Sequence, residues 1–282
     1  MTTDTPNRNG ATATTIPSRR WRLRTVGFYG AVVVTIGLFV LLLGDYLVFP
    51  FTPHPAGTTA ALAPHRFHDV VFPLLLVVAL LGLVVQFHRP VDKFVGVLGF
   101  LTVVGLYTGI AAIAGAIDEG ALFLGLGILV AALHPATRTV LHPRRGATLD
   151  RIVLGLVVVA AIPLAAYFVD QFLLQVTGSP ADPHVAEMHY GAMATVAGSI
   201  LVLAVLAALA PVGWRLAAIG AGLLALVWGG ASVVYPTLES SGGVLWGVLA
   251  ILWAVAFVVA IEHAHRGERS AVRHGGEVVG PA

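Results

Sequence analysis

The sequence has no cysteine among its 282 residues. This absence excludes structural disulfides, thiolate metal sites and iron–sulfur clusters held by cysteine. A metal ion or haem in this chain must therefore use histidine, methionine, tyrosine or carboxylate ligands. The sequence also lacks a P-loop, a G-x-S-x-G motif, an HExxH motif and a dinucleotide-binding fingerprint, so no soluble catalytic motif indicates an enzyme class.

Charged residues are also scarce. They make up 11% of the chain, and hydrophobic residues make up 57%, whereas a soluble domain has about 25% charged residues. This composition predicts an all-α integral membrane protein. Eight apolar runs, bounded by Pro, Gly or charge, are expected to be transmembrane helices, although the fourth is near the lower length limit for spanning. They cover residues 26–49, 67–87, 94–116, 120–134, 152–176, 186–210, 213–234 and 243–262.

The basic residues are distributed unevenly between the loops. When the loops are assigned alternately to two sides, Arg66 stands alone on one side and the rest of the 16 Lys and Arg fall on the other. The positive-inside rule then places both termini in the cytoplasm of a multi-pass cell-membrane protein. The basic charge is a topology signal, so the predicted partner is the lipid bilayer and not nucleic acid. The only lysine, Lys93, lies in a cytoplasmic loop, which argues against a retinal Schiff base within the membrane.

The two halves of the sequence look like copies of one four-helix unit. Asp45 and Asp170 lie at matching places near the ends of the first and fifth runs, and His65 and His184 each follow a proline that opens the next run. Because each copy has an even number of spans, the two copies are expected to point the same way. The predicted units are a disordered cytoplasmic tail (1–24), the first repeat (25–138), a cytoplasmic linker (139–151), the second repeat (152–265) and a cytoplasmic tail (266–282).

A histidine cluster is expected on the outer side of the membrane. His65 and His68 fall on one face of the second run, and His184 opens the sixth run behind Pro183. His189 departs from the repeat, because on a continuous helix it would lie about 8 Å further along the axis than His184. The candidate cofactor ligands are His65, His68, His184 and His189, and the candidate metal ligands are these histidines together with Asp45 and Asp170.

The two aspartates are expected to face the bundle interior, because a bare carboxylate facing lipid is costly. Three functions remain open for the cluster. The first is a haem- or metal-binding redox protein with its site in the outer leaflet. The second is a small cation- or proton-coupled transporter that uses Asp45 and Asp170. The third is an accessory subunit that packs against a membrane-protein partner or forms a homo-oligomer, with the histidines merely solvated at the interface.

Six other histidines lie near arginines on the cytoplasmic side and are expected at the membrane surface. The histidines expected at the surface are His88, His134, His142, His263, His265 and His274.

Two GxxxG patterns, Gly105–Gly109 and Gly243–Gly247, predict close helix contacts.

Eight spans in two four-helix halves, each with histidines, resemble in outline the haem A synthases. In that family the haem-ligating histidines come from the second and fourth helices of each half and meet on one side of the membrane. Here His134 and His263 are expected on the opposite side from His65 and His184. The resemblance therefore extends to the outline of the fold, and it assigns no residue a role.

Overall fold

A computed structural model describes residues 19–48, 51, 65–116, 119–137, 150–209 and 212–275. Within these ranges the chain is helical, with turns and short 3-10 segments between the helices and no strand. The helices are α1 (Arg19–Val48), α3 (Arg66–Val84), α4 (Phe94–Ile113), α5 (Glu119–Leu133), α7 (Arg151–Thr177), α8 (Pro183–Ala186), α9 (His189–Leu209), α10 (Trp214–Val234) and α11 (Gly243–Gly275).

The helices match the apolar runs of the sequence. In the described part of the chain, 7 helices are long and apolar enough to cross a membrane. The helix of the fourth run, α5, is apolar but has only 15 residues. The protein is therefore a multi-pass helical membrane protein.

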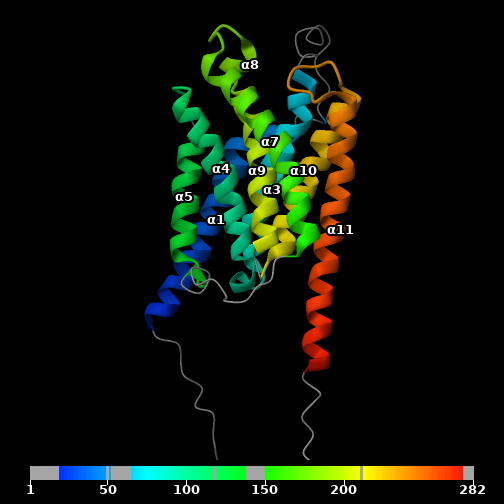
Figure 1. Cartoon of the computed structure of the whole chain (residues 1–282). Helices are drawn as coiled ribbons and strands as arrows, with labels where there is room; N and C mark the ends of the chain where they lie inside the picture. The colour runs from blue at the N-terminus through cyan, green and yellow to red at the C-terminus, as the bar shows by residue number, and fades with distance from the viewer. Residues whose placement is uncertain are drawn as a thin grey trace, which may run out of the picture.

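The long helices run roughly side by side in one bundle (Figure 1). The start of α1 and the end of α11 lie at the same end of the bundle, and α8 lies at the opposite end. In Figure 1, α5 lies alongside α4 and runs in the opposite direction. We call the end that carries α8 the α8 end.

Each half of the chain closes into a ring of four helices. In the first half α1 contacts α3 and α5, and α4 contacts the same two helices; in the second half α7 contacts α9 and α11, and α10 contacts the same two. The halves meet through α3 and α4 on one side and α9 and α10 on the other. This arrangement puts four helices at the centre and leaves α1, α5, α7 and α11 at the periphery.

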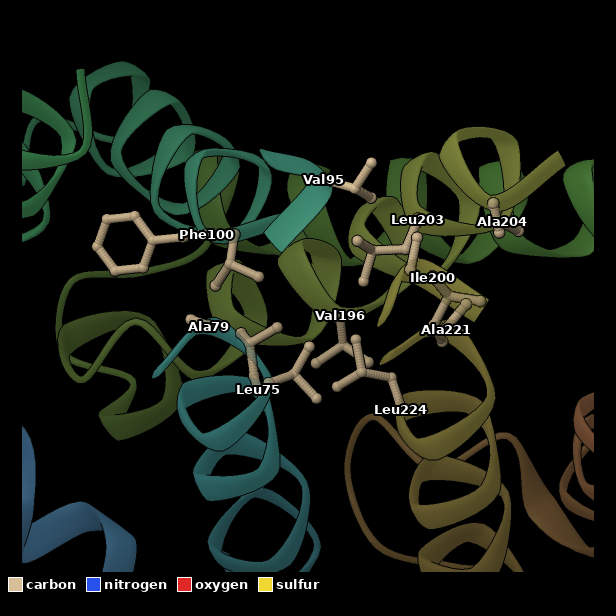
Figure 2. Close-up of a cluster of buried hydrophobic side chains, with 14 of the residues drawn as sticks. Leu75, Ala79, Val95, Phe100, Val196, Ile200, Leu203, Ala204, Ala221 and Leu224 are labelled. Carbon is tan, nitrogen blue, oxygen red and sulfur yellow. The ribbon is translucent and has the colours of Figure 1, made fainter. Parts of the chain in front are cut away.

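The apolar core lies between the four central helices. Figure 2 shows buried side chains from this region, among them Leu75 of α3, Ile200 of α9 and Leu224 of α10, and each of these is at most 2% exposed. By contrast, only 17% of the apolar stretch of α7 is buried, whereas 61% of the apolar stretch of α9 is buried. The large apolar side chains that remain exposed on the peripheral helices suit contact with lipid tails.

Glycines allow α10 and α11 to approach closely. A Cβ atom added to Gly229 would lie 2.6 Å from the carbonyl oxygen of Gly247, and the reverse distance is the same. Gly247 belongs to one predicted GxxxG pattern, so the close contact expected there is present. In the other pattern, a Cβ on Gly109 would meet nothing within 4 Å. A side chain at position 247 would push the two helices apart.

Two helices extend beyond the predicted boundaries of the repeats. α1 begins at Arg19, so residues 19–24, which we expected in a disordered tail, are helical. α11 continues to Gly275, well past the predicted end of the second repeat at residue 265.

Candidate metal centre

Four imidazoles converge at the α8 end of the bundle, two from each half of the chain. Each offers one ring nitrogen, and these four nitrogens lie within 4.8 Å of one another. The ring centroids are 4.6 Å apart for the closest pair and 6.5 Å apart for the most distant. We call this set the histidine group: His65, His68, His184 and His189.

The first two histidines are placed by the start of α3. His65 is the N-cap residue of this helix and His68 lies in its first turn. Residues three positions apart share a helix face, so both rings point to the same side, as the spacing predicts. Pro64, which was expected to open this helix, lies outside the described residues.

The other two histidines are brought together by a break in the chain. Asp182 caps α8, accepting a hydrogen bond from the backbone N–H of His184 at 2.9 Å, and Pro183 occupies the first turn, as predicted. α8 then ends, Met188 adopts a left-handed backbone with φ 58°, and α9 begins at His189. The prediction that His189 lies a further 8 Å along one helix axis is therefore wrong, because the sequence run contains two helices.

Three of the rings have one nitrogen held from outside the group. His184 donates from Nδ1 to Asp182 Oδ1 at 3.2 Å, His189 Nε2 lies 3.3 Å from Glu187 Oε2, and His68 Nε2 lies 3.0 Å from Ser240 Oγ. If each outer nitrogen carries the proton, the inner nitrogen of each ring keeps its lone pair. Metal-binding histidines are commonly oriented in this way by a second acceptor.

The ring nitrogens that face into the group have few hydrogen-bond partners. Nδ1 of His68 and Nε2 of His184 are buried and form no hydrogen bond within the described ranges of the chain. His65 Nδ1 and His189 Nδ1 lie 3.0 Å apart, so one ring donates to the other. His68 itself is 1% exposed. Because a buried polar atom without a partner is destabilising, these atoms indicate a ligand that the side chains alone do not supply.

The backbone is strained at two positions of the site. Among the described residues other than glycine, positive φ occurs at Arg89, Met188 and Ser240. Met188 precedes His189 and Ser240 contacts His68, so two of the three residues belong to the site. Strained backbone of this kind persists only where the surrounding contacts hold it, and it clusters at functional sites.

The surroundings of the group favour a cation. Hydrogen bonds from the backbone N–H and the ring of His184 hold the pKa of Asp182 below its usual value, so this carboxylate is charged beside the group. Glu187 lies 3.3 Å from His189, and Tyr190 donates to Glu239 at 3.1 Å close by. Nearby carboxylates stabilise positive charge on a bound ion.

Asp45 and Asp170 do not belong to the convergent group. Both are exposed, on the peripheral helices α1 and α7, so the expectation that they face the bundle interior is wrong. Asp170 accepts a hydrogen bond from Gln171 on the same helix. Sequence reasoning missed Ser240, because it lies in the turn before α11 and only the fold brings it to His68.

His134 is also placed differently from our expectation. It is fully buried rather than at the membrane surface. Its Nε2 donates to Gln86 Oε1 at 3.1 Å, and its Nδ1 accepts from the backbone N–H of Ala136 at 3.0 Å. Burial and the neighbouring Arg24 lower its pKa to about 4. With both nitrogens satisfied, His134 joins the end of α5 to the turn after α3 and is a structural residue.

Three further histidines with described side chains do not belong to the histidine group. His88 and His263 are exposed, as predicted, and the ring of His265 stacks on Trp214 at 4.2 Å. His54 and His142 lie outside the described residues.

No protein-family model matches the sequence, and comparisons with curated proteins and with solved structures give no match.

Proposed function

We propose that this chain is a membrane protein that binds a single transition-metal ion through the histidine group. The convergence of four imidazole nitrogens within 4.8 Å carries the proposal. In a tetrahedral site with metal–nitrogen bonds of about 2.0–2.1 Å, the ligand nitrogens lie roughly 3.3–3.4 Å apart. A small inward movement of the rings is therefore enough to complete such a site.

A single ion fits the group better than haem. A porphyrin supplies four nitrogens to its iron and takes only one or two axial protein ligands. Four imidazoles that converge from both halves of the chain occupy the space that the porphyrin ring needs. Imidazole ligands suit copper, zinc and iron, and Cu²⁺ is expected to bind more tightly than Zn²⁺. Copper or iron would support a redox role, which is the first of the three functions that were considered from the sequence.

The membrane arrangement is part of the proposal. We infer eight crossings, a four-plus-four repeat and cytoplasmic termini, which put the histidine group in the outer leaflet. The common end of α1 and α11 in Figure 1 and the matching helix contacts of the two halves support this arrangement. A homo-oligomer or a membrane-protein partner stays a prediction.

The transporter alternative has less support. It relied on Asp45 and Asp170 as interior cation sites, and both carboxylates are exposed on peripheral helices.

The proposal is tested by elemental analysis and by absorption spectra, oxidised and dithionite-reduced, of the detergent-purified protein. We expect close to one equivalent of copper, zinc or iron and no Soret band. A Soret band would show that haem is bound instead. A protein that takes up no metal from buffered Cu²⁺ or Zn²⁺ would contradict the proposal.

A further inference from the structure

A cavity of about 460 Å³ adjoins the histidine group. His65, His68 and His189 line it at one end, while His184 does not. One side of the group is therefore open to the cavity. An ion held by four histidines takes a further ligand only by expanding to five-coordination, as zinc does in some sites, and a molecule in the cavity is placed to supply that fifth ligand.

The rest of the cavity is apolar. Its walls come from α1, α3, α4, α5 and α9, and include Phe39, Phe72, Leu76, Val104 and Phe123. The volume falls within the roughly 300–1,000 Å³ of small-molecule sites, which are mostly apolar with a few convergent polar groups. The combination of long apolar walls and one polar end suits an amphiphile and not a water-soluble metabolite.

The cavity is lined at α1 by residues that are also exposed. Leu42 and Tyr46 line it and are 45% and 47% exposed. Both lie within a helix that is long and apolar enough to span a membrane. A ligand can therefore enter from the bilayer without crossing water.

The polar end selects the head group. Asp69 and Glu187 line the cavity beside the histidines, and Glu119 lines it on α5. These acids oppose the attraction of the metal for an anionic head such as a fatty-acid carboxylate. A neutral hydroxyl has a proton to donate to a carboxylate and a lone pair to offer to a metal, so both kinds of group at this end are satisfied.

We propose that the cavity binds a neutral, hydroxyl-bearing lipophilic molecule, of the alkylphenol or quinol type, with its oxygen directed to the metal site. The inference rests on the proposed metal binding and adds the class of ligand. Three observations carry it: the open side of the histidine group, the apolar walls and the opening toward lipid.

The test uses the full-length protein in lipid nanodiscs, loaded with Co²⁺, whose visible absorption responds to a change in coordination. The probe is 4-octylphenol, and the controls are octylbenzene, which lacks the hydroxyl, and octanoate, which is anionic. We expect a saturable change in the cobalt spectrum with 4-octylphenol alone. The same change with octylbenzene, or no change with 4-octylphenol, would overturn the head-group assignment.

Two variants on α1 locate the ligand. Leu43 lines the cavity, whereas Leu41 is 76% exposed and does not line it. We expect Leu43→Trp to weaken 4-octylphenol binding at least tenfold while keeping the cobalt stoichiometry, and Leu41→Trp to change neither. An unchanged affinity in Leu43→Trp would overturn the cavity assignment. Failure of the wild-type protein to bind cobalt would instead overturn the metal site on which the inference rests.

Discussion

Nδ1 of His65 and Nδ1 of His189 lie 3.0 Å apart, although 124 positions separate them in the sequence. His65 comes from the first half of the chain and His189 from the second. The candidate centre therefore forms only when the two halves pack together, and a bound ion would stabilise that packing by its binding free energy.

Removal of one buried ligand should nearly abolish metal binding. In His68→Ala we expect the affinity for Zn²⁺ to fall by more than about 100-fold, because even loss of an outer hydrogen-bond partner costs 10- to 100-fold. The affinity is measured by competition with a chromophoric chelator. His263→Ala is the matched control, because His263 is exposed on α11 and is not part of the histidine group. Equal affinities in the two variants would show that the histidine group is not the site.

The outer partners should tune the site without forming it. Ser240→Gly removes the hydroxyl beside His68 and places glycine at a position with φ 64°. We expect the affinity for Zn²⁺ to fall by about 10-fold. The metal-free protein should change in stability by no more than about 1 kcal/mol, because the strain that glycine relieves offsets the hydrogen bond lost at His68. An affinity that stays at the wild-type value would exclude Ser240 from the site.

The stability of the metal-free protein should fall in acid because of His134. Its pKa is lowered from 6.5 to about 4 in the folded state. The unfolded chain therefore binds more protons below pH 6.5, and the contribution of neutral His134 is complete above this pH and is lost as the pH falls toward 4. The loss is on the order of 3 kcal/mol over this interval.

His134→Gln isolates this effect, since glutamine keeps a donor toward Gln86 and does not titrate. Thermal unfolding of both proteins is measured in detergent with a chelator, from pH 4 to 8. The wild type should be more stable than His134→Gln above pH 6.5, and the difference in stability should shrink as the pH falls. A gap that is independent of pH would contradict the assignment of His134 as a buried neutral residue.

The contact between α10 and α11 predicts a difference between two glycines. Gly247→Ala places a methyl group 2.6 Å from a backbone oxygen of α10 and should destabilise the protein by about 1–3 kcal/mol. Gly109→Ala enters open space and should be neutral or slightly stabilising. Thermal unfolding of the two variants in the same detergent measures the difference, and equal stabilities would show that α10 and α11 do not meet at Gly247.

The absence of cysteine allows a direct test of topology. Glu119 and Arg151 are exposed at the starts of α5 and α7. If α5 crosses the membrane, an impermeant maleimide should label Glu119→Cys in intact cells and Arg151→Cys only after permeabilisation. Labelling of both from the same side would remove the eighth crossing and the four-plus-four repeat.

Sequence reasoning recovered the helices well, because apolar runs bounded by Pro, Gly or charge determine helix positions in a bilayer. It also selected the four histidines that converge. It could not foresee the break at Met188, since a left-handed residue in a short turn leaves no periodic signal, and so it misplaced His189. Asp45 was misjudged because matching positions in two copies do not reveal which face of a helix packs inward.

The most direct test of the metal centre is electron paramagnetic resonance of the protein loaded with one equivalent of Cu²⁺. We expect one copper species whose hyperfine pattern shows coordination by several imidazole nitrogens, and we expect His68→Ala to lose this species. A copper signal that is the same in wild type and His68→Ala, or one without nitrogen ligands, would contradict the proposed metal site.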